Sequence, residues 1–365
     1  MQRVFVTLVP QQPPSSEISP MNARASIASI RLLIVAGTFG FAASATAQDT
    51  CKNRGELDAM YCDENGDLTA DPPKDAAKLK TPNTIVFTYT PVEDPAVYEK
   101  VFRPFTDHLG QCTGKRVVFY QVQSNAAEIE AMRSGRLHVG GVSTGPTAFA
   151  VNIAGAVPFA VKGNDKEWQG YNLIVVVKKD SPIQKMADLK GKKVAHTSPS
   201  SNSGNLAPRA LFPGLGVKPD DDYKVLYSGK HDSSVLGVRS GDYDAAPVAS
   251  DVFHRMAARG QVKEDEFRII WRSQKFPTSS FAYAHDLEPT FRDKMLKCFY
   301  DYRFTAEMTK AFDGADRFFP ITYKNDWEVV RKVAEGSGEV FNKAGYDREV
   351  KREDEARKKA AAAKK

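Results

Sequence analysis

Short β-rich runs alternate with helical patterns from Thr84 onward, and this alternation constrains the fold more than any other feature of the sequence. Such alternation is typical of β-α units with mostly parallel sheets, so we expect an α/β protein. The predicted strands are 84–89, 117–122, 137–142, 156–161, 172–178, 193–196, 224–227, 244–248, 267–271 and 281–285. The predicted helices are 95–109, 126–134, 146–153, 205–211, 233–240, 250–258 and 287–305.

Charge and proline interrupt this alternation at 178–183, and a second break follows at 275–280. Two breaks of this kind predict two lobes with two hinge crossings and a cleft between them, where ligands of open α/β sheets bind. Each lobe should be a mixed, mostly parallel sheet with helices on both faces. We therefore assign 83–178 plus 281–345 to lobe 1 and 179–280 to lobe 2, with a leader at 48–82 and a charged tail at 346–365.

The net charge of +6 lies at the ends of the 365-residue chain. Residues 1–47 carry +2 and residues 348–365 carry +4, which leaves the body between them balanced. A nucleic-acid reader usually carries a basic patch on its folded domain, so we predict no nucleic-acid partner. Nothing in the sequence argues for an oligomer, and we expect a monomer. The tail is Ala-rich and has no apolar face to bury, so we expect it to be frayed or disordered.

The N-terminal region resembles a secretory signal. Met21 is a more natural start than Met1, since residues 11–20 are polar and Pro-rich, and Arg24 and Arg31 precede a short apolar run at 32–43. Ala45-Thr46-Ala47 is an A-x-A cleavage site, so we expect export and cleavage after Ala47. The alternative is a retained membrane anchor, which the shortness of the run disfavours.

Export changes the interpretation of the four cysteines, because an oxidising compartment favours two disulfides. Three connectivities are possible, and sequence alone does not choose among them. We favour Cys51–Cys62, which would tie a Gly/Asp-rich leader, and Cys112–Cys298. Neither CxxC nor a His cluster occurs, and we predict no metal and no cofactor.

A hydroxyl-rich segment at 196–205 follows a predicted strand and precedes a helix. A helix N-terminus presents unpaired N–H groups and the positive end of its dipole, and nearby hydroxyls add donors, so this segment can bind an oxyanion. Its candidate ligand-binding residues are Ser200, Ser201, Asn202 and Ser203. The alternative is an ordinary helix cap, which needs one hydroxyl only.

Two further strand ends carry candidate site residues. His231 lies at a predicted helix start and could meet the same oxyanion, although a lone histidine is more often structural. Asp251 could contact a cationic or hydroxyl part of a ligand, or it could simply favour the first turn of its own helix. An enzyme is disfavoured, because G-x-S-x-G, HExxH, P-loop and G-x-G-x-x-G motifs are absent.

Taken together, the motifs resemble the periplasmic phosphonate-binding protein family of ABC transporters, which includes phosphite and phosphate binders. The resemblance runs from about Thr84 to Asn325. It is carried by Glu130-Ala-Met-Arg-Ser-Gly135, Val177-Lys-Lys-Asp-Ser-Pro-Ile183, Asp188-Leu-Lys-Gly-Lys-Lys-Val194, Pro199-Ser-Ser-Asn-Ser-Gly204, Gly229-Lys-His231 and Asp242-Tyr-Asp-Ala-Ala246.

This resemblance implies a type II periplasmic-binding fold and a protein that delivers a small oxyanion to an inner-membrane permease. Ser201, Asn202 and Ser203 would hold phosphonate oxygens together with His231, and Asp251 matches a position that can face the amino end of a ligand. The two lobes would close on the ligand, and no covalent bond would be made or broken.

Four residues bear on the ligand's substituent. Asn125 and Thr144 stand where the family places aromatic cleft residues, and Ser279 stands where aminoalkylphosphonate binders place an acid. This departure disfavours 2-aminoethylphosphonate and favours a smaller or uncharged substituent, including phosphite or phosphate. From the topology, Tyr89 could replace some of the lost aromatic contact.

The alternative function is a periplasmic sensor that presents an oxyanion such as arsenite to a histidine kinase. Arsenite chemistry needs a free thiol, for which Cys112 or Cys298 would be the candidate. A disulfide between these two cysteines would exclude that route.

Overall fold

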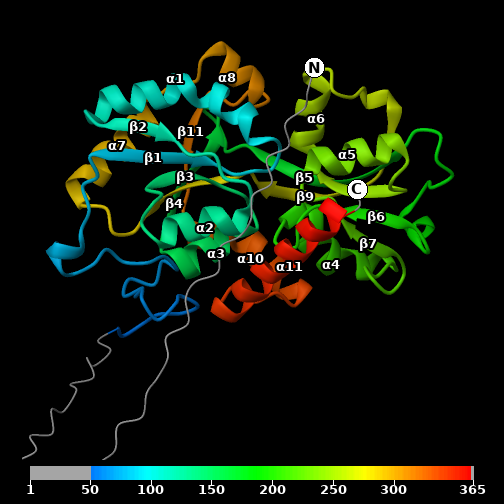
Figure 1. Cartoon of the computed structure of the whole chain (residues 1–365), viewed down its shortest axis with the longest axis horizontal. Helices are drawn as coiled ribbons and strands as arrows, with labels where there is room; N and C mark the ends of the chain where they lie inside the picture. Colours follow the sequence, from blue (N-terminus) through cyan, green and yellow to red (C-terminus); the bar gives the residue numbers. More distant parts are fainter. Residues whose placement is uncertain (1–50, 363–365) are drawn as a thin grey trace, which may run out of the picture. The chain divides into compact units, whose positions relative to one another are not determined.

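A computed structural model describes residues 51–362, which form two sheets with helices packed on them (Figure 1). The predicted export signal and its cleavage site lie outside the described residues. None of the helices in 51–362 is both long and apolar enough to cross a membrane.

The first sheet has the strand order β11-β4-β10-β3-β1-β2, and with its helices it forms lobe 1. Asp94 caps its first helix by accepting the N–H of Ala96, and Pro95 occupies the first helical position, as the sequence predicts. Its strands are β1 (Thr84–Tyr89), β2 (Arg116–Phe119), β3 (Val139–Val142), β4 (Ala156–Gly163), β10 (Ser280–Ala284) and β11 (Arg317–Pro320). Its helices are α1 (Pro95–Thr113), α2 (Asn125–Arg133), α3 (Pro146–Ala154), α7 (Pro289–Asp301), α8 (Ala306–Ala311) and α9 (Tyr323–Asp326).

The second sheet has the order β7-β6-β8-β5-β9 and forms lobe 2 with its helices. Its strands are β5 (Gly170–Lys178), β6 (Lys193–His196), β7 (Lys224–Tyr227), β8 (Ala245–Ala249) and β9 (Phe267–Pro277). Its helices are η2 (Met186–Leu189), η3 (Asn202–Leu206), α4 (Ala207–Leu211), η4 (Phe212–Leu215), α5 (His231–Ser240), α6 (Ser250–Ala258) and η5 (Glu264–Glu266). The π-helical turn η3 runs directly into α4.

Both sheets are mixed, as expected, but antiparallel pairing is more frequent than we predicted. In the first sheet β1 pairs in parallel with β2 and β3, whereas β10 and β11 pair antiparallel with their neighbours. In the second, β5 runs antiparallel to both β8 and β9. Buried apolar strands look alike in sequence whichever way they pair, so the alternation pattern overestimated the parallel share.

The predicted first hinge crossing, at Lys178, is placed too late. Strand β4 belongs to the first sheet and β5 to the second, so the chain crosses between Gly163 and Gly170. The charged segment after Lys178 is a turn within lobe 2, where the N–H of Lys179 bonds to the carbonyl of Glu266. The return crossing lies between β9 and β10, at Thr278 and Ser279.

An aromatic core fills lobe 1 between the first sheet and the helices α1 and α7. Phe105 lies within 5 Å of Phe299 and Phe318, measured between ring centroids at 4.6 and 4.7 Å. The disulfide Cys112–Cys298 joins the same two helices, and Cys51–Cys62 closes the leader, which confirms both favoured pairings.

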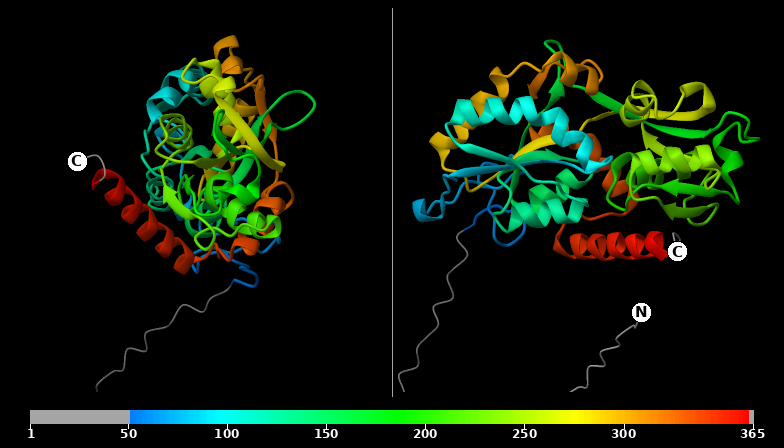
Figure 2. Two further views of the ribbon diagram at one scale, coloured as in Figure 1. Left: turned by 90° about the vertical axis from the view of Figure 1, so that its right-hand side faces the viewer. Right: turned by 45° about the horizontal axis from the view of Figure 1, so that its top comes forward.

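The prediction of a frayed tail is wrong for most of its length. The helix α11 (Lys343–Ala362) follows α10 (Glu328–Ser337), and α11 lies along the boundary between the two lobes (Figure 2). Tyr346 and Glu349 are buried, and Val350 packs against the core. This apolar contact is short and confined to the start of the helix, so the sequence shows little periodicity there.

The lobes approach closely where Gly145, at the N-terminus of α3, meets the loop before η3. A Cβ at Gly145 would overlap the carbonyl oxygen of Ser200 and lie 2.9 Å from the backbone nitrogen of Asn202. Only glycine allows this approach, so the closed arrangement depends on it.

We predict that Gly145→Ala weakens ligand binding and leaves the stability of each lobe nearly unchanged. Overpacking of this kind costs about 1–3 kcal/mol, which corresponds to a dissociation constant raised roughly 5- to 100-fold. Calorimetric titration and thermal unfolding would test it. Gly214→Ala is the matched control, because a Cβ there meets nothing within 4 Å, and equal affinities for the two variants would contradict the prediction.

Candidate functional site

A cavity of about 50 Å³ lies between the two lobes, where strand ends of both sheets meet. Nine of the ten predicted ligand-binding residues line it. These are Tyr89, Asn125, Thr144, Ser201, Asn202, Ser203, His231, Asp251 and Ser279. Their position agrees with the prediction, and their role toward a ligand stays a prediction.

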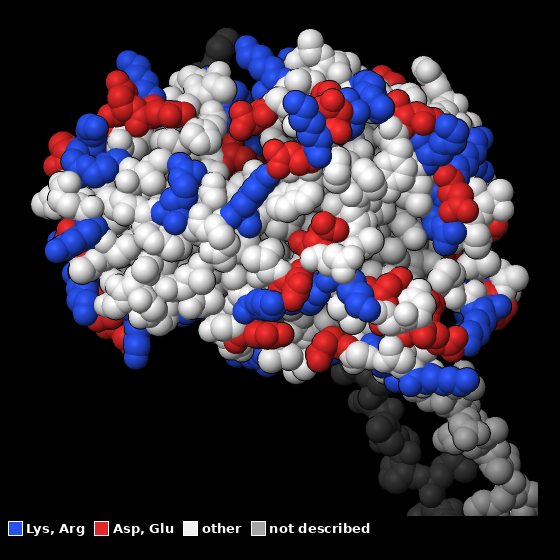
Figure 3. Space-filling model, turned by 180° about the vertical axis from the view of Figure 1, so that it is seen from behind, with Lys and Arg blue, Asp and Glu red and all other residues white. Residues whose placement is uncertain are grey.

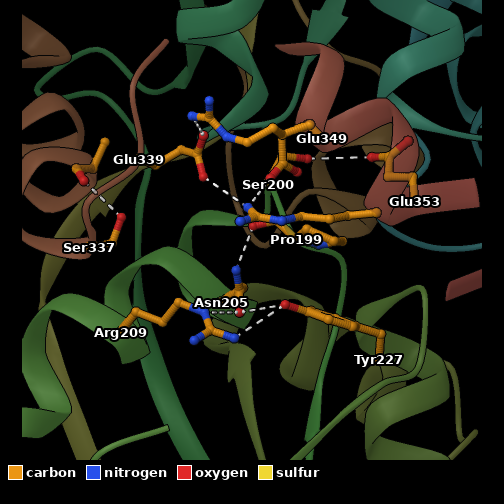
Figure 4. Close-up of polar contacts among 12 residues, drawn as sticks. Pro199, Ser200, Asn205, Arg209, Tyr227, Ser337, Glu339, Glu349 and Glu353 are labelled. Carbon is orange, nitrogen blue, oxygen red and sulfur yellow. Dashed lines mark hydrogen bonds and ion pairs between the residues drawn. The ribbon is translucent and has the colours of Figure 1, made fainter. Parts of the chain in front are cut away.

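Ser200 is the exception, because it is not among the residues that line the cavity. Its hydroxyl donates to Oε1 of Glu353 at 3.4 Å (Figure 4). It also accepts from Nδ2 of Asn125 at 3.5 Å. The neighbouring Ser201 instead caps η3, since its Oγ accepts the N–H of Gly204 at 3.1 Å. The hydroxyls of these adjacent serines therefore have different partners, because Ser200 contacts Glu353 and Ser201 caps η3.

Helix N-termini from both lobes converge on the cavity. Asn125 and Thr144 lie at the starts of α2 and α3 in lobe 1. Asn202, His231 and Asp251 lie in the first turns of η3, α5 and α6 in lobe 2. First-turn N–H groups have no acceptor within their own helix, and the dipoles place positive potential there. The arrangement favours an anion.

Several buried polar atoms in the cavity wall lack a partner among the described residues. They are Oγ1 of Thr197, Oδ1 of Asn202 and Oγ1 of Thr278. Buried polar groups are nearly always hydrogen-bonded in folded proteins, so such a group in a cavity wall is available to a ligand or to water. The two hydroxyls are donors that suit an oxyanion.

His231 is held as a neutral donor toward the cavity. Its Nδ1 accepts the N–H of Ala249 at 3.2 Å, so in the neutral ring the proton resides on Nε2. This Nε2 lies 3.5 Å from Oγ of Ser201. Burial lowers the pKa of His231 to about 4, an effect that Asp251 and Glu93 oppose. The imidazole therefore contributes a hydrogen bond and no charge at neutral pH.

Asp251 lines the cavity, but Arg255 occupies its carboxylate. The two side chains pair at 2.7 Å along one face of α6, and Arg255 also pairs with Glu93 at 2.9 Å. Arg259 pairs with the other oxygen of Glu93, and the hydroxyl of Tyr98 donates to Oε1 at 3.0 Å. Glu93 follows β1 in lobe 1, so this ion-pair network links the lobes. Burial acts to raise the pKa of Asp251, but the attraction and hydrogen bond of Arg255, together with Lys162 and His231, lower it overall.

Lys162 supplies a second buried cation behind the cavity wall. It is 1% exposed, and its Nζ donates to the hydroxyl of Tyr89 at 2.6 Å. The ammonium also lies over the rings of Tyr89 and Phe312, at 5.1 and 5.0 Å from their centroids. Tyr89 therefore presents to the cavity an aromatic ring whose hydroxyl is polarised by a positive charge.

Sequence reasoning missed Lys162, Arg255 and Tyr171, whose hydroxyl accepts from Nδ2 of Asn202 at 3.1 Å. The i, i+4 spacing of Asp251 and Arg255 was a usable signal for an ion pair. No comparable signal in the sequence pointed to Lys162, because the predicted strand 156–161 ended one residue before it.

The thiol route to arsenite is excluded, because Cys112 and Cys298 form a disulfide and none of the four described cysteines is free. Residues 51–362 also contain no cluster of His, Cys, Asp and Glu that could hold a metal ion. On the face shown in Figure 3, positive and negative side chains are interspersed.

Comparison with known proteins agrees with this geometry. The family described as "ABC transporter, phosphonate, periplasmic substrate-binding protein" matches residues 87–327. The phosphate-import protein PhnD of Mycolicibacterium smegmatis is 28% identical over 243 residues, which cover 63% of this chain and 75% of that protein.

Two solved structures share the fold. A binding protein of a phosphonate ABC transporter from Pseudomonas aeruginosa has a TM-score of 0.63 at 20% identity, covering 77% of this chain and 99% of that one. PhnD1 of Prochlorococcus marinus, in complex with methylphosphonate, has a TM-score of 0.62 at 19% identity, covering 70% and 98%.

We predict that His231 stays neutral from pH 8 down to about pH 5 in the folded protein. A histidine with a lowered pKa binds fewer protons when folded, so its contribution to stability falls as pH drops from about 6.5 toward 4. Nitrogen NMR shifts of the ligand-free protein would show no protonation of this ring above pH 5. A midpoint near 6.5 would contradict the assigned tautomer and burial.

Proposed function

Because this chain belongs to the family of periplasmic substrate-binding proteins of phosphonate ABC transporters, we propose that it captures a small phosphorus oxyanion for import. Members of this family bind solutes and are not enzymes, in agreement with the motif analysis. The ligand of this chain, phosphite, phosphate or a short phosphonate, is part of the proposal.

The observation that supports it best is the convergence of helix N-termini and hydroxyls on one small cavity. Lys162, Arg255 and Arg259 lie opposite Asp251 and Glu93, and Lys230 also lines the cavity, so the charged groups around the cavity carry a net positive charge. A site of dipoles and neutral donors with a slight positive excess replaces the hydration of a small anion. Closure of the lobes removes the remaining water.

The size and charge of the cavity favour a small ligand without an amino group. A volume of about 50 Å³ suits an oxyanion with at most a short substituent. Asp251 is neutralised by Arg255, and Ser279 brings no carboxylate. The relatives that bind phosphate and methylphosphonate, by their names, are consistent with this choice.

Delivery of the bound ligand to a membrane permease is the second part of the proposed function. A substrate-binding component implies a membrane permease as its partner, and the expected export signal would place the protein in the periplasm. We propose that the closed, ligand-loaded form is the one the permease receives, and that the protein acts as a monomer.

We predict that phosphite, phosphate or methylphosphonate raises the unfolding temperature of the purified protein, and that 2-aminoethylphosphonate, sulfate and arsenite do not. A ligand at 100 times its dissociation constant stabilises by about 2.7 kcal/mol, which a thermal scan resolves. If no phosphorus oxyanion shifts the transition, the proposed function fails. A shift with 2-aminoethylphosphonate alone would overturn the choice of substituent.

We further predict that His231→Ala and Ser203→Ala each weaken binding of the identified ligand about tenfold to hundredfold. The loss of one hydrogen bond to a charged group costs roughly 1.5–3 kcal/mol. Calorimetric titration measures the affinity, and His254→Ala is the control for histidine removal, since His254 lies on α6 outside the cavity wall. Unchanged affinity in both site variants would refute the site assignment.

A further inference from the structure

The C-terminal helix α11 contacts the functional loops of both lobes, although it lies outside the motifs that define the family. The family match ends at residue 327, whereas α11 begins at Lys343. Glu353 of this helix lines a second chamber of about 510 Å³. That chamber shares Asn125, Thr197, Ser198 and Lys230 with the oxyanion cavity, so α11 stands at its mouth.

The start of α11 is fixed to lobe 1. The hydroxyl of Tyr346 donates to the carbonyl of Ala126 at 3.1 Å, and its ring lies 6.0 Å from that of Phe149 on α3. Before the helix, the carbonyl of Phe341 accepts from Asn152 at 2.7 Å. These bonds attach the start of α11 to lobe 1, whereas the preceding helix α10 packs against α4 and η3 of lobe 2.

Arginines stiffen α11 against the segment that precedes it. Arg352 pairs with Glu339 at 3.0 Å and Arg348 pairs with Glu339 at 3.4 Å, whereas the pair of Arg352 with Glu349 at 3.0 Å lies within α11 itself (Figure 4). Both glutamates are buried or nearly so, which gives these pairs more weight than exposed ones have. The two pairs with Glu339 join α11 to the segment before it.

Glu353 then makes the contact across the lobes. Its Oε2 accepts the N–H of Ala126 in lobe 1 at 3.3 Å, and its Oε1 accepts the hydroxyl of Ser200 in lobe 2 at 3.4 Å. Ser200 precedes Ser201 in the loop that lines the cavity. The same loop is supported from its other side by Asn205, whose Nδ2 donates to the carbonyl of Pro199 at 2.6 Å (Figure 4).

We propose that Glu353 is a positioning residue that latches the closed lobes together by holding Ser200, and that α11 thereby slows ligand release. This proposal rests on the proposed function, since it concerns the closed, ligand-bound form. A lobe that opens must break the bond between Glu353 and Ser200 without breaking the bonds that attach α11 to lobe 1. The latch therefore acts on the dissociation rate rather than on the contacts to the ligand.

The test measures ligand release from the full chain by stopped-flow displacement, with the phosphorus oxyanion that stabilises the wild-type protein as the probe. Glu353→Ala should raise the dissociation rate about tenfold. Glu353→Gln keeps a carbonyl oxygen at the same reach and should restore much of the slow release. Glu355→Ala, an exposed position on the same helix, should release ligand at the wild-type rate.

A double-mutant cycle with Ser200→Ala distinguishes the latch from direct contact with the ligand. If the latch operates, Ser200→Ala speeds release to a similar degree, and the double variant is no faster than Glu353→Ala. Effects that multiply, or a fast Ser200→Ala variant beside a normal Glu353→Ala variant, would overturn the proposal. Failure of the wild-type protein to bind any probe would instead refute the proposed function.

Discussion

The ion pair between Arg255 and Glu93 is the interaction on which the closed arrangement depends. The two side chains come from different lobes, and they are 6% and 1% exposed. A buried charge without a partner is strongly unfavourable. Both arginine partners of Glu93 come from the other lobe, whereas Arg255 also pairs with Asp251 on its own helix. Asp251, Arg259 and Tyr98 satisfy the remaining positions of the pair. The ion pair between Arg255 and Glu93 therefore forms when the two lobes close.

This network also explains how the site favours an anion without a dedicated ligand arginine. Arg255 is neutralised by two carboxylates, and the ammonium of Lys162 donates a hydrogen bond to the hydroxyl of Tyr89. What remains for a ligand is a ring of dipoles, hydroxyls and the neutral imidazole of His231, in a weakly positive field. Such groups stabilise an oxyanion strongly where water is absent, and only weakly where it is present.

Local sequence signals were sufficient for most of the strands and for the helix starts, because caps and glycine stops act within a few residues. They also placed Ser201, Asn202, Ser203 and His231 at helix N-termini, where the structure finds them. Local signals failed where long-range packing determines whether a helix or strand forms. Strand β11 and helix α11 have weak patterns of their own and form because neighbours cover them.

The sequence by itself determined the α/β alternation, the hydroxyl-rich helix start and the set of residues that could meet an oxyanion, since these follow from local backbone chemistry. Only the tertiary structure decided which side chains face the cavity. It turned Ser200 toward Glu353, tied Asp251 to Arg255 and brought Lys162 behind Tyr89. Ser200 and Lys162 have partners many residues away, which local spacing does not encode. The i, i+4 spacing of Asp251 and Arg255 allowed their pair but did not show that it faces Glu93.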